Sequence, residues 1–133
     1  MDVMIDTNVI ISAALFPNQR MNHFLEVVSL SHSLFLCSYT LEEIDRVIKK
    51  KFPNRMNAME IFLRKLSFTL IHTPTVNVVD LDFSVRDGKD YPIIVSAIIA
   101  DVDILITGDN DFDDVNVERP EIVTIAEFMN LYG

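Results

Sequence analysis

The sequence has a single cysteine, Cys37, and therefore no partner for a disulfide within its 133 residues. Cys37 ends an apolar run at residues 34–37, which favours a buried, inert thiol over a reactive one. No apolar run approaches the ~18 residues of a membrane helix, and no signal peptide precedes the first predicted strand. These absences predict a soluble, cytoplasmic protein.

Repeats, low-complexity tracts and linker-like segments are also lacking, which predicts a single domain spanning residues 1–133. Hydrophobic residues make up 50% of the sequence, so disorder is excluded. A domain of this length can bury a substantial core without the support of disulfides.

Basic side chains are scarce, and the formal net charge of −9 argues against nonspecific, charge-driven binding of nucleic acid. Ten of the 20 acidic residues lie between Asp80 and Asp114, whereas seven of the 11 basic residues lie between Arg46 and Lys65. This distribution predicts either an acidic and a basic pole or merely solvated helical faces, and the sequence leaves both interpretations open.

Apolar segments with the periods of strands and helices alternate along the chain. Strands are expected at residues 2–5, 34–37, 68–71, 104–106 and 122–125. Helices are expected at residues 9–15, 21–30, 40–51, 55–66, 91–100 and 126–131, and residues 73–89 form a long connection with room for an edge strand at 76–79. This alternation predicts the α/β class, as a three-layer α/β/α sandwich with a central, mostly parallel sheet.

Some side chains have simple structural interpretations. The helix at residues 91–100 is almost entirely apolar and is expected to be deeply buried. His23 and His32, at the two ends of the second helix, are expected on the surface. Thr40 and Glu43 fit a capping box, and Asp90 fits an N-cap, so neither acid needs a functional role to explain its position.

Four carboxylates nevertheless stand where strands end or helices begin. Asp6 and Asp109 follow predicted strands, and Glu43 and Asp90 lie near predicted helix starts. In a parallel sheet these positions share one edge, where ligands of α/β proteins bind. Two carboxylates about 4 Å apart repel by roughly 4 kcal/mol at an effective dielectric near 20, so such a cluster requires protons or a cation.

A hard divalent cation is the simplest partner for such a cluster. Oxygen ligands suit Mg²⁺ or Mn²⁺, and the absence of paired cysteines or closely spaced histidines argues against zinc. Asn8 and Thr107 could hold water or orient the carboxylates. A bound cation of this kind orients water and neutralises phosphate, which suits phosphodiester hydrolysis.

The order and spacing of four segments resemble the PIN-domain family of metal-dependent ribonucleases, which includes the toxins of VapBC-type toxin-antitoxin pairs. The segments are DTNVIISA at 6–13, SYTLEEIDRVI at 38–48, DYPIIVSA at 90–97 and LITGDNDF at 105–112. The resemblance spans essentially the whole chain. The TGD sequence at 107–109, in place of TRD, is most similar to a toxin group within the family.

The resemblance implies specific roles for the acidic residues. It assigns the catalytic quartet to Asp6, Glu43, Asp90 and Asp109, and it assigns one or two Mg²⁺ or Mn²⁺ ions to Asp6, Asp90, Asp109 and Asp111, with Asn8 and Thr107 as supporting groups. It further implies a single-stranded RNA substrate, cleavage leaving a 3′ hydroxyl and a 5′ phosphate, an antitoxin protein as a possible partner, and a homodimer.

Other functions share parts of this pattern. A PIN scaffold that binds RNA or a partner protein without cutting it is the main alternative. A haloacid dehalogenase-type phosphatase needs a second aspartate where Asn8 stands, and a response-regulator receiver needs an acidic doublet that is absent here. The basic segment, defined as Lys49, Lys50, Lys51, Arg55, Arg64 and Lys65, is a candidate track for an RNA backbone.

Overall fold

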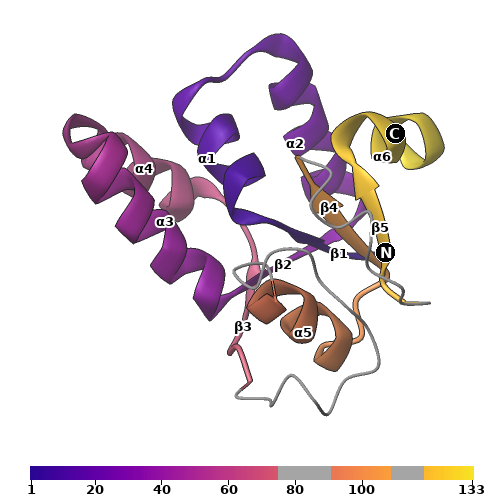
Figure 1. Ribbon diagram of the computed structural model, residues 1–133. Coiled ribbons are helices and arrows are strands. Elements are labelled where there is room, and N and C mark those ends of the chain that lie inside the picture. Colours follow the sequence, from indigo (N-terminus) through magenta and orange to yellow (C-terminus); the bar gives the residue numbers. More distant parts are fainter. Residues whose placement is uncertain (75–90, 109–118) are drawn as a thin grey trace.

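The fold is known from a computed structural model that describes residues 1–74, 91–108 and 119–133. Five strands form one parallel sheet in the order β3-β2-β1-β4-β5 (Figure 1). The strands are β1 (Asp2–Ile5), β2 (Ser33–Cys37), β3 (Thr69–Ile71), β4 (Ile104–Thr107) and β5 (Glu121–Thr124). The helices are α1 (Thr7–Leu15), α2 (Gln19–Ser31), α3 (Ser38–Lys51), α4 (Met56–Lys65), α5 (Tyr91–Ile99) and α6 (Ile125–Tyr132), with a 3₁₀ turn, η1 (Pro53–Arg55), before α4.

The predicted α/β sandwich is confirmed, and its strands pair in parallel throughout the described sheet. Val3 pairs with Leu34 of β2 on one side and with Ile104 of β4 on the other, which makes β1 the central strand. The expected edge strand at residues 76–79 and most of the long connection around it lie outside the described residues. Because the strands are parallel, all their carboxyl ends lie along the same edge of the sheet.

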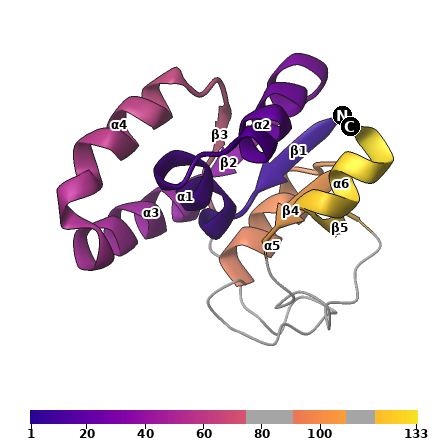
Figure 2. The same cartoon turned by 90° about the horizontal axis from the view of Figure 1, so that it is seen from above.

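Alternating side chains of the central strands divide the core into two parts. Val3 and Ile5 face a larger core beneath α1, α2, α3, α4 and α6, whereas Met4 and Leu105 face a smaller core beneath α5. Figure 1 and Figure 2 show α5 alone on its side of the sheet among the described helices. The three predicted layers are present, but the two helical layers are unequal.

The apolar helix α5 is deeply buried through its middle and exposed at its end. Ile93 and Ile94 are 1% and 0% exposed, as expected for a helix packed on the sheet. Ile99, however, is 61% exposed at the end of the helix. The expectation of deep burial is therefore confirmed for five consecutive residues, 93–97, each at most 2% exposed, and the exposed Ile99 lies at the end of the helix. No helix in the described ranges is long and apolar enough to span a membrane.

Helix α6 begins with a capping box that is not among the predictions from the sequence. The Thr124 hydroxyl accepts a hydrogen bond from the Glu127 amide, and the Glu127 carboxylate accepts one from the Thr124 amide, each at 3.1 Å. These two bonds satisfy amides that a helix start otherwise leaves unpaired. The helix therefore starts at Ile125 rather than at residue 126.

Two acids from the acid-rich region between Asp80 and Asp114, Asp101 and Asp103, lie at the amino edge of the sheet. The carboxylate of Asp103 accepts a hydrogen bond from the Asp2 amide at 2.8 Å and pairs with Arg119 at 2.7 Å. Arg119 also pairs with Asp101 at 2.8 Å. The hydrogen bond from Asp2, followed by the charge of Arg119, lowers the pKa of Asp103. These acids connect β1, β4 and the start of β5, at the edge opposite Asp6.

His32 is partly buried, contrary to the expectation of a surface position. Its ring lies 5.3 Å from the Phe128 ring, and its Nδ1 lies 3.3 Å from the amino group of Met1. Burial, and secondly the charge of that amino group, lower the pKa of His32. His23 is exposed, as expected. The difference arises because α6 packs over the end of α2, where His32 lies.

The lowered pKa of His32 predicts a pH-dependent contribution to stability. Between its folded pKa and the ordinary value of about 6.5, the unfolded chain binds more protons than the folded one, so the free energy of unfolding increases with pH. The contribution is complete above that window and is lost as pH falls through it. The midpoint of urea unfolding, measured across this range, should fall less with acid in His32→Gln than in the unmutated protein. Equal slopes for both proteins would contradict the prediction.

Candidate active site

The carboxyl ends of β1 and β4 lie at the point where the strand order reverses. The chain passes from β1 to β2 on one side and later returns to β4 on the other side of β1. Helices that leave neighbouring strands in opposite directions open a crevice at such a point, where ligands of open α/β sheets bind. The two strand ends are joined by a hydrogen bond of 3.0 Å from the Asp6 amide to the Ile106 carbonyl.

Asp6 occupies this switch point as a buried carboxylate. Its side chain is held on both sides, because Oδ1 accepts a hydrogen bond from the Val9 amide at 3.0 Å and Oδ2 accepts one from the Thr107 hydroxyl at 2.7 Å. Asp6 and Thr107 are only 4% and 3% exposed. The first bond makes Asp6 the N-cap of α1, and the second joins two residues that lie 101 positions apart in the sequence.

Gly108 allows the end of β4 to lie close to α1. A Cβ atom at this position would come within 3.3 Å of Cγ2 of Val9, a buried residue of α1. Such a contact is tighter than ordinary packing, so a larger residue would require the Val9 side chain to shift by a few tenths of an ångström. Glycine therefore lets the end of β4 and the first turn of α1 pack closely without such a shift.

Two further polar residues follow Asp6 on the first turn of α1. Asn8 is exposed and lines a cavity of about 250 Å³ with Ser12, Met21 and Gly108. Thr7 is buried, and its hydroxyl has no hydrogen-bond partner among the described residues. An unsatisfied buried hydroxyl costs about 1–3 kcal/mol, so a bound water or ligand oxygen at this edge would be stabilised there. The sequence reading assigned Thr7 no role.

Glu43 lies on α3 without the capping role considered for it. The helix begins at Ser38, so Thr40 is inside the first turn, where its hydroxyl lies 3.3 Å from Sγ of the buried Cys37. The amide of Tyr39, in the first turn, instead donates to Oγ1 of Thr73 at 2.9 Å. The capping-box interpretation of Glu43 is therefore wrong, and its carboxylate is available for another role.

Tyr39 is a neighbour of Glu43 that the sequence reading did not identify. Its hydroxyl donates to Oε2 of Glu43 at 3.4 Å, and the Arg46 guanidinium lies 5.6 Å from the centre of its ring. Burial, and secondly the charge of Glu43, raise the pKa of Tyr39, so its hydroxyl stays protonated and able to donate. The sequence signal for this contact is the spacing of four residues between Tyr39 and Glu43, which places both on the same face of the helix.

Three of the predicted site residues, Asp90, Asp109 and Asp111, lie outside the described residues. Within the described part, no group of three or more histidine, cysteine, aspartate or glutamate side chains could hold a metal ion. The polar side chains at the switch point nevertheless all offer an oxygen atom as a metal ligand, and they belong to Asp6, Thr7, Asn8 and Thr107. The single thiol of the sequence, Cys37, is buried against Thr40. This donor set fits Mg²⁺ or Mn²⁺ and does not fit zinc.

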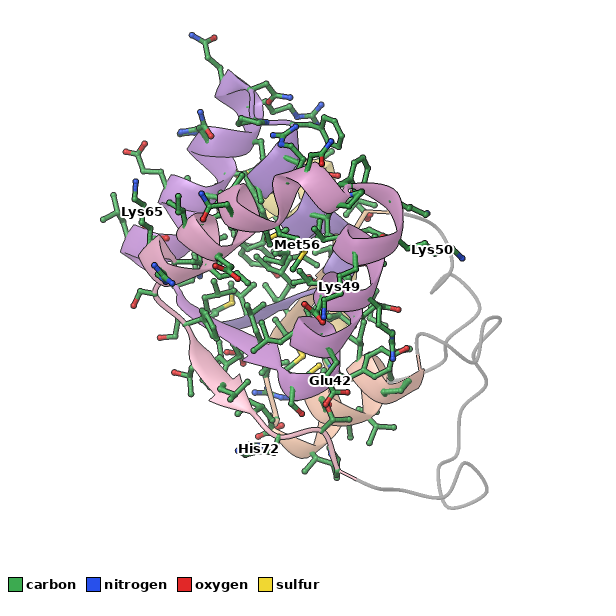
Figure 3. The ribbon with its side chains drawn as sticks, turned by 90° about the vertical axis from the view of Figure 1, so that its left-hand side faces the viewer. Glu42, Lys49, Lys50, Met56, Lys65 and His72 are labelled. Carbon is green, nitrogen blue, oxygen red and sulfur yellow. The ribbon has the colours of Figure 1, made fainter. Side chains whose placement is uncertain are left out.

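The basic segment does not form one continuous patch. Figure 3 shows Lys49 and Lys50 near the end of α3, whereas Lys65 lies at the far end of α4. Lys49 forms an ion pair with Asp45 at 2.8 Å, and Arg55 donates a hydrogen bond to the Leu15 carbonyl at 3.2 Å. Both contacts give these two cations a structural partner, and the proposed contact with RNA remains a prediction.

Comparisons with known proteins agree with this geometry. A search of curated protein sequences gave no match. One similar solved structure is the crystal structure of VapBC2 from Rickettsia felis bound to a DNA fragment from their promoter. The superposition has a TM-score of 0.68 at 18% sequence identity and covers 92% of this chain and 97% of the other, which shows a shared fold. The sequence model of the PIN domain matches residues 2–111. The chain therefore belongs to the PIN domain family.

Proposed function

We propose that this protein is a metal-dependent endoribonuclease that hydrolyses phosphodiester bonds of single-stranded RNA, as the toxin of a type II toxin-antitoxin pair. The observation that carries the proposal is the buried carboxylate of Asp6, held by the Thr107 hydroxyl and the Val9 amide at the switch point of the sheet. The two hydrogen bonds lower the cost of burying this carboxylate, and the switch point is where ligands of such folds bind. Membership of the PIN domain family supports the same function.

The proposed catalytic acids are Asp6, Glu43, Asp90 and Asp109, and the proposed metal ligands are Asp6, Asp90, Asp109 and Asp111. One or two bound Mg²⁺ or Mn²⁺ ions would activate a water molecule and stabilise the leaving oxygen of the phosphodiester. Thr107 fixes the orientation of the Asp6 carboxylate, and Tyr39 donates to the Glu43 carboxylate. Asn8 is an exposed amide able to contact water or substrate at the same edge.

An antitoxin protein and a second copy of the chain are the proposed protein partners. The structural similarity to a chain of the VapBC2 complex supports the first, and family resemblance supports the second. Growth arrest on expression, relieved by a protein encoded beside this one, is the expected result for a toxin. Cleavage without growth arrest would favour a role in RNA processing.

The enzymatic proposal is tested by incubating the purified protein with end-labelled structured and single-stranded RNAs, with Mn²⁺ or with EDTA. The expected result is cleavage of single-stranded segments that requires the metal and leaves a 3′ hydroxyl and a 5′ phosphate. An Asp6→Asn preparation purified in parallel reveals any contaminating nuclease. RNA binding or capture of a partner protein without any cleavage would contradict the enzymatic proposal and favour a non-catalytic scaffold.

Replacing Thr107 by valine tests whether its hydroxyl orients a metal-binding carboxylate. Valine keeps the shape of threonine but removes the donor to Asp6, and loss of such a supporting bond lowers metal affinity or activity by about ten- to a hundredfold. Calorimetric titration with Mn²⁺ should show this weaker binding, whereas Thr107→Ser, which keeps the hydroxyl, should bind close to normally. Equal affinities for the valine and serine variants would show that the hydroxyl has no such role.

A further inference from the structure

A groove extends from the candidate active site between the first turns of α2 and α6. It consists of two cavities of about 320 and 250 Å³ that share Met21, Gly108 and Ile125 in their linings. The larger cavity also reaches Thr107, the residue that holds the Asp6 carboxylate. Figure 1 shows α2 and α6 on the same side of the sheet, with β4 between them. The groove is therefore continuous with the switch point.

The groove combines one cation with neutral polar groups and an apolar surface. Arg20 supplies the positive charge, and the half-buried Met21 and Ile125 supply the apolar surface. The neutral polar residues that line the two cavities are Asn8, Ser12, Asn18, Thr107 and Thr124. Among the described lining residues none is acidic, although the whole protein has a net charge of −9. Because Arg20 is the one charged residue among the described lining residues, this part of the groove favours an anionic ligand.

Two of the polar residues are held in place by helix capping. Oδ1 of Asn18 accepts a hydrogen bond from the Met21 amide at 2.8 Å, and Thr124 caps α6 through its hydroxyl. The Asn18 bond uses its oxygen, so the amide nitrogen of the same side chain takes no part in it. Pre-positioned polar groups of this kind bind a ligand with little loss of side-chain entropy.

We propose that this groove binds one nucleotide of the RNA strand next to the bond that is cleaved. Single-stranded RNA is bound by cations at its phosphates, by apolar or aromatic surfaces at its bases and by amides at base edges, and the groove offers each of these. Cavities of this size suit a small ligand rather than a helix of a partner protein. The proposal rests on the ribonuclease function for the position of the scissile phosphate, and it makes Arg20 a phosphate contact.

The test adds a negative charge inside the groove and an equal charge outside it. Ala126 is an exposed lining residue in the first turn of α6, where glutamate is compatible with the helix. Ser29 is an exposed residue near the other end of α2 and lines neither cavity. Ala126→Glu is therefore the test variant, and Ser29→Glu is its control. Urea unfolding of both variants checks that the fold is retained.

Affinity is measured by fluorescence anisotropy with short, labelled oligouridylate and oligoadenylate in EDTA, so that no RNA is cleaved. Ala126→Glu should weaken binding about tenfold, which corresponds to about 1.4 kcal/mol, whereas Ser29→Glu should stay within about twofold. Arg20→Gln should also weaken binding and reduce the slope of log affinity against log salt by about 0.7, as expected for one lost phosphate contact on a single strand.

The outcomes separate this proposal from the proposed function. Unchanged RNA affinity in Ala126→Glu and Arg20→Gln, with cleavage by the unmutated protein intact, would overturn the proposal that the groove binds RNA. The proposed ribonuclease function would still hold. Weakened RNA binding in both variants, with no cleavage by any preparation, would support RNA binding in the groove and contradict the proposed ribonuclease function. Loss of a protein partner in these variants with normal RNA affinity would assign the groove to protein binding and overturn the proposal.

Discussion

Replacing Asp6 by asparagine is expected to reduce metal-dependent RNA cleavage by about a thousandfold while the fold remains intact. Asparagine keeps Oδ1 as the acceptor for the Val9 amide and nearly the same volume in a site that is 4% exposed. It lacks the negative charge that we propose binds the cation. A bound cation supplies several kcal/mol of transition-state stabilisation, and each 1.4 kcal/mol is worth about a factor of ten in rate.

The Asp6 prediction has two measurements that do not depend on each other. Initial cleavage rates across Mn²⁺ concentration report the chemistry. Thermal unfolding reports metal binding, because a cation that binds only the folded protein raises the midpoint temperature of unfolding as the cation concentration increases. The unmutated protein should show that increase, and Asp6→Asn should show little of it.

Asp45→Asn is the matched control for Asp6→Asn. Asp45 is half-exposed on α3 and pairs only locally with Lys49, four residues later, so its loss should leave cleavage within about twofold. If both variants cleave as fast as the unmutated protein, the switch point is not the active site. If both lose activity equally, a general effect of charge would explain the result instead.

Replacing Phe128 by alanine is expected to lower the free energy of unfolding by about 3–5 kcal/mol. Phe128 is completely buried, and its ring lies edge-on to Phe24 at 5.9 Å between centroids. It is the fully buried residue of α6, so its removal leaves a cavity where that helix packs on α2. A domain of this kind is stable by only about 5–15 kcal/mol in total, so the loss is a large share of its stability.

Urea unfolding followed by circular dichroism measures the effect of Phe128→Ala. Phe16→Ala provides the comparison, because Phe16 is 55% exposed and contacts Phe52 at its ring edge. The loss there should stay below about 1.5 kcal/mol, the upper range for an aromatic pair. A cost at Phe128 no larger than that at Phe16 would show that α6 contributes little to folding.

The part of the site contributed by Asp6 and Thr107 could be anticipated from the sequence. Each follows or ends an apolar strand, and parallel strands place such positions at one edge of a sheet. Their hydrogen bond confirms that the two strand ends meet there. The catalytic and metal-binding roles of Asp6, Glu43, Asp90, Asp109 and Asp111 all remain proposals, and the last three lie outside the described residues.

The same sequence pattern of threonine followed three residues later by glutamate occurs twice, with different outcomes. At Thr124 and Glu127 it forms a capping box, whereas at Thr40 and Glu43 it does not. The two outcomes differ because of a contact with a residue far away in the sequence. Thr73, two residues after the end of β3, accepts a hydrogen bond from the Tyr39 amide at the start of α3, and the helix therefore begins two residues before Thr40.

The sequence by itself determined the class of the fold, the approximate positions of its elements and the edge of the sheet at which Asp6 and Thr107 lie. It could do so because apolar periodicity and turn residues act over a few neighbouring positions. The tertiary structure decided which residue caps α3, why His32 is partly buried and where the groove between α2 and α6 lies. These features depend on contacts between residues far apart in sequence, which form only once the strand order β3-β2-β1-β4-β5 brings their elements together.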